Sequence, residues 1–236
     1  MMTKALVDSG RAGRLLVIDA DPALGQLSAL GASVRRTMGQ VREEVIETAK
    51  RGNKEAKAEL AEKLDYMVFE SLCEMDDFAL LAMGRTETLG CFCSVNGLLR
   101  RAIEMLADNF DTILIDGEAG LEQINRQVVR NLDTLMIISD PTARGMETAA
   151  VIRDMVDKDH IIECQRKGIV FNRVRDDGRK LRESAEKLGL ELFGLVPQDE
   201  TIAEYDLEGR PITSLPAEAA GPAAVRDIVE RVILRD

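Results

Sequence analysis

The sequence of 236 residues has no tryptophan, only four cysteines and a single histidine. Four cysteines are too few for a disulfide scaffold in a chain of this length, and the first ten residues contain no apolar leader segment. We therefore expect a cytoplasmic protein with reduced thiols. The one histidine, His160, lies in a charged stretch, which gives no basis for a Ser-His-Asp or Cys-His catalytic pairing.

Basic residues are also scarce, 31 against 42 acidic ones, which gives a formal net charge of -11. A field of that sign repels phosphate backbones and anionic lipid headgroups, so we expect neither nucleic acid nor a membrane surface as a partner. Hydrophobic residues make up 45% of the chain and charged residues 31%. This globular composition excludes the disordered, fibrous and membrane-embedded classes.

Short apolar runs rich in β-branched residues alternate with helical stretches. Because the runs are continuous, we expect strands buried on both faces, as in a mostly parallel sheet covered by helices on both sides, which is an α/β fold. Residues 33–75 lack strand signals, and we expect them to form a helical insert in a single domain spanning residues 1–236. The predicted strands are Leu15–Asp19, Phe78–Met83, Thr112–Asp116, Thr134–Ser139, Gly168–Asn172 and Leu192–Val196.

Polar side chains end several of these runs. Asp19 and Asp21 follow the first run, and Asp116 ends the third in the pattern of a Walker B carboxylate, which holds Mg²⁺. The carboxyl ends of parallel strands border the ligand crevice of an open sheet, so these acids are candidates for binding a ligand or metal. A role in capping the next helix or in a turn stays open for Asp19 and Asp21. Asn172 offers a donor and an acceptor to an adenine edge.

Cys91 and Cys93 are separated by one residue and directly precede a predicted helix. Backbone amides at a helix start favour thiolates, the form of cysteine that binds metal. A closed site needs four ligands, so a two-fold dimer would have to supply the other two. Two small buried residues without a metal remain the alternative.

The sequence resembles the deviant-Walker ATPases of the MinD/ParA type in segments that follow the order of that family: IDADP (18–22), IDGEAG (115–120), IISDPTARG (137–145), FNR (171–173) and LVPQDE (195–200). The segment GCFCSVNGLLR (90–100) narrows the resemblance to the accessory ATPases that mature carbon monoxide dehydrogenase by supplying nickel. The resemblance covers the whole chain.

For the nucleotide, the resemblance implies ATP and Mg²⁺ as ligands. Asp19 and Asp21 would belong to the first switch, where they position Mg²⁺ and the attacking water. Asp116 would be the Walker B acid, and Gly120 would lie in the second switch, which senses the terminal phosphate.

For adenine and metal, the resemblance implies two further groups. Asn172 and the turn from Pro197 to Asp199 would hold adenine. Cys91 and Cys93 would form a four-thiolate site for Ni²⁺ or Zn²⁺ with the same residues of a homodimer mate. ATP-driven rearrangement of that dimer would deliver metal to a client of the carbon monoxide dehydrogenase type.

One departure from the family pattern concerns the phosphate loop. The sequence contains no G-x-x-x-x-G-K-[ST] and no Gly-Lys dipeptide, and residues 1–10 resemble the later turns of the helix that should follow such a loop and end at a glycine cap. We expect a missing upstream segment of roughly 20 residues, through start-site choice, a cloning artefact or true loss in a degenerate paralogue. Without those amides and lysines, we expect weak or no ATP binding by this chain.

Two other function classes remain open. The first is a degenerate non-ATPase assembly or regulatory module of the same fold. The second is an iron–sulfur redox protein like the related nitrogenase-type reductases, although those proteins take their cysteines from separate segments rather than from one Cys-x-Cys pair.

Overall fold

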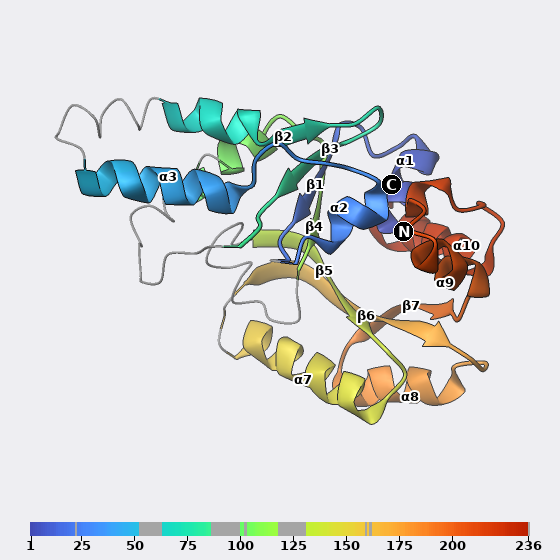
Figure 1. Ribbon diagram of the computed structural model, residues 1–236. Helices are drawn as coiled ribbons and strands as arrows, with labels where there is room; N and C mark the ends of the chain where they lie inside the picture. Colours follow the sequence, from blue (N-terminus) through green and yellow to red (C-terminus); the bar gives the residue numbers. More distant parts are fainter. Residues whose placement is uncertain are drawn as a thin grey trace. The chain divides into compact units, whose positions relative to one another are not determined.

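The structure is a computed structural model that describes residues 1–21, 23–51, 63–85, 100–101, 103–117, 131–158, 160 and 162–235 (Figure 1). The chain divides into two compact units, one built on residues 12–117 and the other on residues 1–11 and 131–235. Each unit has its own sheet over these residues. The organisation of residues 1–236 as a single domain stays a prediction.

The sheet of the first unit has the strand order β2-β3-β1-β4. β1 pairs in parallel with both β3 and β4, and β2 pairs antiparallel with β3. All residues of β1 and β3 are buried, as expected from their continuous apolar runs. The bounds are Leu15–Asp19 for β1, Leu72–Glu74 for β2, Ala79–Ala82 for β3 and Thr112–Asp116 for β4.

Two features of this sheet differ from the sequence prediction. β2 lies inside the stretch predicted to be helical only, because pairing with β3, from Leu72 opposite Leu81 to Glu74 opposite Ala79, stabilises this three-residue strand. β4 is not buried on both faces: Ile113 is 40% exposed. β4 ends the strand order of the described residues, so it has a strand neighbour on one side only.

The described helical residues of this unit form α2 (Gly25–Leu30), α3 (Met38–Arg51), a helix at residues 63–70 and helical stretches at residues 100–101 and 103–107 (Figure 1). Apolar residues spaced by three or four positions form one buried stripe on each of the two longer helices. These two helices lie within the stretch predicted to be a helical insert, and residues 52–62 lie outside the described residues; the insert itself stays a prediction. The buried residues are Met38, Val41, Val45 and Ile46 in α3, and Leu64, Met67 and Val68 in the second helix.

The sheet of the second unit has the order β5-β6-β7, and all of its pairings are parallel. α7 contacts β5 and β6, α8 contacts β7, and α10 contacts β7. Figure 1 shows α7 and α8 along one side of this sheet and α10 on the other. The strands are β5 (Asn131–Ser139), β6 (Glu163–Val174) and β7 (Glu191–Pro197); the helices are α7 (Ala143–Asp157), α8 (Arg179–Leu188), α9 (Glu200–Leu207) and α10 (Ala220–Ile228), with a 3-10 turn at Ile212–Ser214 and a π-helical turn at Val229–Ile233.

The N-terminal helix α1 (Met2–Ser9) belongs to this second unit and packs on α10. Gly10 ends it in a left-handed conformation with φ 64°, and the Gly10 N–H donates to the Val7 carbonyl at 3.0 Å. Glycine adopts this conformation without a steric penalty. The predicted helix over residues 1–10 with a glycine cap is therefore confirmed.

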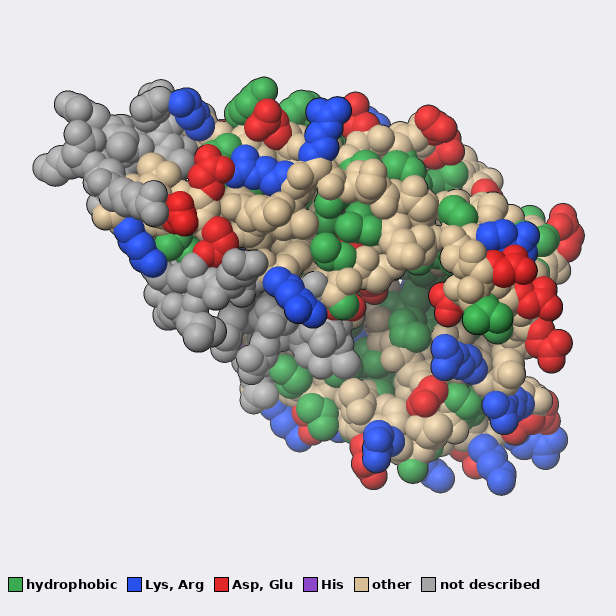
Figure 2. Space-filling model, viewed as in Figure 1, with side chains coloured by type: hydrophobic (Ala, Val, Ile, Leu, Met, Phe, Trp, Pro, Cys, Tyr) green, Lys and Arg blue, Asp and Glu red, His purple; other side chains and the backbone are tan. Residues whose placement is uncertain are grey.

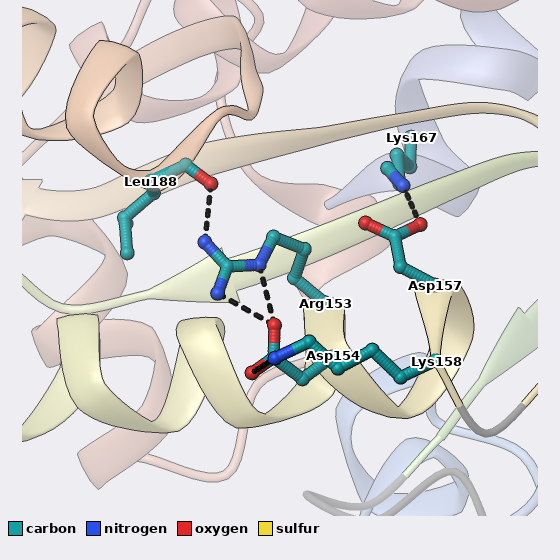
Figure 3. A network of polar contacts seen from close by, with 6 residues as sticks. All are labelled: Arg153, Asp154, Asp157, Lys158, Lys167 and Leu188. Carbon is teal, nitrogen blue, oxygen red and sulfur yellow. Dashed lines mark hydrogen bonds and ion pairs between the residues drawn. The ribbon is translucent and has the colours of Figure 1, made fainter.

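A polar network joins the ends of α7 and α8 (Figure 3). Arg153 Nη1 donates to the Leu188 carbonyl at 2.6 Å, which satisfies an acceptor in the last turn of α8. Arg153 Nε donates at 2.8 Å to Asp154 Oδ1. The network consists of Arg153, Asp154, Asp157, Lys158, Lys167 and Leu188, from α7, the residue after it, β6 and α8.

Acidic and basic side chains are interspersed over the described part of the face shown in Figure 2. Several of them form surface ion pairs, such as Arg166 with Glu191 and Lys158 with Asp154. No helix among the described residues is long and apolar enough to cross a membrane.

Candidate functional site

Two predicted site residues, Asp19 and Asp116, lie side by side at the carboxyl edge of the first sheet. They are register partners in the parallel pairing of β1 with β4, and each is the last residue of its strand. Asp19 is 0% exposed, and Asp116 is half-buried. The backbone holds them in place, because the Ala20 N–H donates to the Asp116 carbonyl at 2.9 Å and the Met83 N–H donates to the Asp19 carbonyl at 2.8 Å.

The Asp19 carboxylate fixes the loop that follows β1. Its Oδ1 accepts the Asp21 N–H at 3.1 Å and its Oδ2 accepts the Gln26 N–H at 3.2 Å. Burial raises the pKa of Asp19, and the charges of Asp116 and Asp21 raise it further, against the lowering effect of the two backbone hydrogen bonds. Two neighbouring carboxylates, one of them fully buried, form an arrangement that a cation would stabilise.

Gln26, in the first turn of α2, links this pair of acids. Its Nε2 donates to Asp116 Oδ2 at 2.6 Å, while its Oε1 is buried and has no hydrogen-bond partner within the described structure. Sequence reasoning assigned no role to Gln26. Its place seven residues after Asp19, in the first turn of the next helix, was the available signal, but the Asp116 contact depends on the register of two distant strands.

Asp21 shapes the turn between β1 and α2. Its Oδ1 accepts the Ala23 N–H at 2.8 Å, and its carbonyl accepts the Leu24 N–H at 3.0 Å. Leu24 has a positive φ of 58°, a conformation uncommon for a non-glycine residue. This is the turn-forming role that the sequence left open for Asp21, and it fixes the start of α2.

The side-chain atoms that could bind a metal at this edge fit Mg²⁺ rather than a soft metal. The Asp19 and Asp116 carboxylates and the unpartnered Gln26 Oε1 offer only oxygen, which hard cations prefer. Within the described ranges, no three His, Cys, Asp or Glu side chains are grouped to hold a metal ion. Mg²⁺ is usually bound through one or two carboxylates together with water and substrate phosphates, so two carboxylates suffice for such a site.

The predicted adenine residues lie in the second unit, where Asn172 precedes an irregular stretch of β6. Asn172 Oδ1 accepts the Arg173 N–H at 2.9 Å, and Arg173 has a positive φ of 60°. The β6–β7 register shifts between Phe171 and Val174, and Val174 then pairs with Pro197. Asn172 and Pro197 thus lie at the carboxyl ends of neighbouring strands.

Asp199 caps two helices in this unit. Its Oδ1 accepts the Thr201 N–H at 2.9 Å, which caps α9, and its Oδ2 accepts the Gly221 N–H of α10 at 2.7 Å. These backbone hydrogen bonds, chiefly the one from Gly221, lower the pKa of Asp199. A role for Asp199 in holding adenine stays a prediction, and its observed contacts are structural.

The remaining predicted site residues, Cys91, Cys93 and Gly120, lie outside the described residues. The thiolate site and the second-switch role therefore stay predictions.

Comparisons with known proteins agree on one family. The CobQ/CobB/MinD/ParA nucleotide binding domain matches residues 2–212. An uncharacterized ATP-binding protein of Methanocaldococcus jannaschii is 38% identical over 239 residues, covering 99% of this chain and 91% of that protein. The carbon monoxide dehydrogenase accessory protein CooC of Rhodospirillum rubrum is 29% identical over 167 residues, covering 66% of this chain and 62% of that protein.

Among solved structures, the septum site-determining protein MinD of Pyrococcus horikoshii, complexed with Mg-ADP, superposes with a TM-score of 0.65 at 20% identity. The match covers 98% of this chain and 87% of that one. At this identity the likeness concerns the fold alone, and it confirms the predicted α/β fold with a mostly parallel sheet. From the match over residues 2–212, the chain belongs to the CobQ/CobB/MinD/ParA nucleotide-binding domain family.

Proposed function

We propose that this protein is a nucleotide-dependent switch ATPase of the MinD/ParA type, in which Asp19 and Asp116 bind the Mg²⁺ that accompanies ATP. One observation carries the proposal: the two carboxylates are register partners at the carboxyl edge of parallel strands, where ligands bind in open α/β sheets. The family of the chain and the Mg-ADP complex of a protein with the same fold support it.

In this proposal each residue has a distinct task. When bound, Mg²⁺ neutralises charge on the phosphates. Asp116, half-buried at the strand end, would hold the cation directly or through a water. Asp19 would hold it as well, while its carboxylate also fixes the start of α2 through the Gln26 N–H. Asp21 would orient the attacking water, as the resemblance implies, from a turn fixed by its own Ala23 contact.

The test is a titration of the protein with ATP, followed by NMR, in the presence of Mg²⁺ and then of EDTA. The titration distinguishes this proposal from the expectation of weak or no ATP binding: under the proposal we expect measurable binding that requires Mg²⁺. Asp116→Asn should weaken it at least about tenfold. The matched control is Asp133→Asn, at an exposed strand carboxylate. Binding that is absent, unchanged by EDTA, or equal in Asp116→Asn and the control would overturn the proposal.

A second, finer candidate is metal delivery to a carbon monoxide dehydrogenase-type client. The Cys91-x-Cys93 pair and the 29% identity to CooC favour it. The proposal is that a homodimer binds one Ni²⁺ or Zn²⁺ through both pairs, which gives about one metal for every two chains. Metal analysis after loading should show that ratio, with binding lost in Cys91→Ser and kept in Cys164→Ser. One metal per chain, or full binding by Cys91→Ser, would contradict it.

A further inference from the structure

The side-chain amide of Gln26 in the first unit has one polar atom that is hydrogen-bonded and one that is not. Its main-chain N–H binds Asp19 Oδ2 at 3.2 Å, and its side-chain Nε2 binds Asp116 Oδ2 at 2.6 Å. The other amide atom, Oε1, is buried and lacks a hydrogen-bond partner in the described part of the chain. A buried acceptor without a partner costs free energy, so its persistence beside two carboxylates calls for a donor that is bound there.

The chemistry of that donor follows from the surroundings. Asp19 and Asp116 would attract a cation, and Mg²⁺ keeps several of its waters when it binds a protein. A water on a cation directs its lone pair to the metal and its hydrogens outward, so it donates hydrogen bonds. An amide oxygen such as Gln26 Oε1 is a suitable acceptor for it.

We propose that Gln26 is a positioning residue of the cation site: its Nε2 orients the Asp116 carboxylate, and its Oε1 accepts a hydrogen bond from a water on the cation. The inference rests on the proposed function and extends it to a residue to which no role was assigned. Outer hydrogen-bond partners of this kind fix the orientation of a ligating carboxylate. Because the amide holds Oδ2 of Asp116, Oδ1 would be the oxygen available to the cation or its water.

The position of Gln26 also ties the site to α2. The same residue donates through its main chain to Asp19 and through its side chain to Asp116, from the first turn of the helix. A shift of the start of α2 would therefore change both carboxylate contacts and move Oε1 together. The contact with Asp19 uses the main chain, whereas the contact with Asp116 depends on the Gln26 side chain.

The experiment measures binding of Mn²⁺ alone by its EPR signal, with no nucleotide present. Gln26→Met keeps the side-chain length and removes both polar atoms, and we expect it to weaken Mn²⁺ binding by about 10- to 100-fold. The matched control is Gln165→Met, which removes an exposed amide that donates to the Asp133 carboxylate at 2.9 Å. It should leave the Mn²⁺ affinity unchanged.

A second readout separates positioning from a merely structural role. In EDTA, the urea midpoint of Gln26→Met should match that of the wild type, because the variant loses one hydrogen bond and also one unpartnered acceptor. A lower midpoint with unchanged Mn²⁺ affinity would overturn the inference in favour of a structural role. So would an affinity equal to that of Gln165→Met.

Asp116→Asn distinguishes a wrong role for Gln26 from a wrong cation site. If Asp116→Asn weakens Mn²⁺ binding and Gln26→Met does not, only the role of Gln26 is wrong. If Asp116→Asn also leaves binding unchanged, the cation site itself is wrong and both proposals fail.

Discussion

Replacing Asp199 by alanine should destabilise the protein through two helix starts at once. The variant removes the acceptor of the Thr201 N–H at 2.9 Å and of the Gly221 N–H at 2.7 Å. Loss of an N-cap costs about 0.5–2 kcal/mol. Gly221 is buried, and leaving a buried donor unpaired costs roughly 1–3 kcal/mol. We therefore expect the free energy of unfolding to fall by about 2–4 kcal/mol.

Asp199→Asn refines this prediction. Asparagine keeps one side-chain oxygen for the Thr201 N–H but places an NH₂ group where Gly221 needs an acceptor. The loss in the free energy of unfolding of Asp199→Asn should therefore lie between zero and the loss of Asp199→Ala. Asp177→Ala is the control, because it removes an exposed carboxylate that accepts the Arg179 N–H at 3.1 Å. We expect the control to cost less than about 1 kcal/mol.

The pH dependence of the same variants supplies an independent check. Hydrogen bonds, first that of Gly221, lower the folded pKa of Asp199 below the usual 3.8. Its contribution is therefore complete above the unfolded pKa and lost as pH falls through the folded pKa. Urea unfolding should show a difference between wild type and Asp199→Ala that is constant at neutral pH and shrinks in acid below about pH 4. A difference under about 0.5 kcal/mol at pH 7 would refute the capping role.

Three further variants test other parts of the structure. Burial, with the nearby carboxylates, raises the folded pKa of Asp19, so its charge costs stability above that pKa. In EDTA, the stability of the wild type relative to Asp19→Asn should therefore rise in urea unfolding as pH falls from 7 toward 3.8, whereas a difference that does not change with pH would contradict the raised pKa. Arg166→Met removes the ion pair with Glu191 and the contact of the guanidinium with the Phe193 ring, 4.7 Å from its centroid. We expect the free energy of unfolding, measured in urea, to fall by about 1–2 kcal/mol. An unchanged value would show that solvent screens both interactions. A Cβ on Gly194 would lie 2.4 Å from the Ile228 side chain, so Gly194→Ala should cost about 1–3 kcal/mol by thermal unfolding, and an unchanged melting temperature would contradict the tight packing.

Local sequence patterns predicted the central strands well. The runs Leu15–Asp19 and Thr112–Asp116 match β1 and β4 residue for residue, because an apolar run that ends at a carboxylate marks both the strand and its end. β2 was missed, since Leu72–Glu74 has no strand pattern of its own and depends on pairing with β3. A strand that is stabilised mainly by pairing with a neighbouring strand has little strand pattern in its own sequence.

The candidate site was predictable as a list of residues and not as a set of contacts. That Asp19 and Asp116 end strands follows from the sequence, whereas their pairing depends on a register between segments far apart in the chain. The Gln26 contact with Asp116 and the Asp199 contact with Gly221 are likewise long-range. Asp199 was assigned to adenine because the resemblance identified a turn, while its observed bonds cap two helices.

Paramagnetic broadening of amide NMR signals by Mn²⁺ locates the cation on the protein and so tests whether Asp19 and Asp116 form its site. We expect low concentrations of Mn²⁺ to broaden the amides of Ala20, Gln26 and Gly117 first, and Asp116→Asn to remove this effect. Broadening spread over the acidic surface, or unchanged by Asp116→Asn, would contradict this assignment of the site.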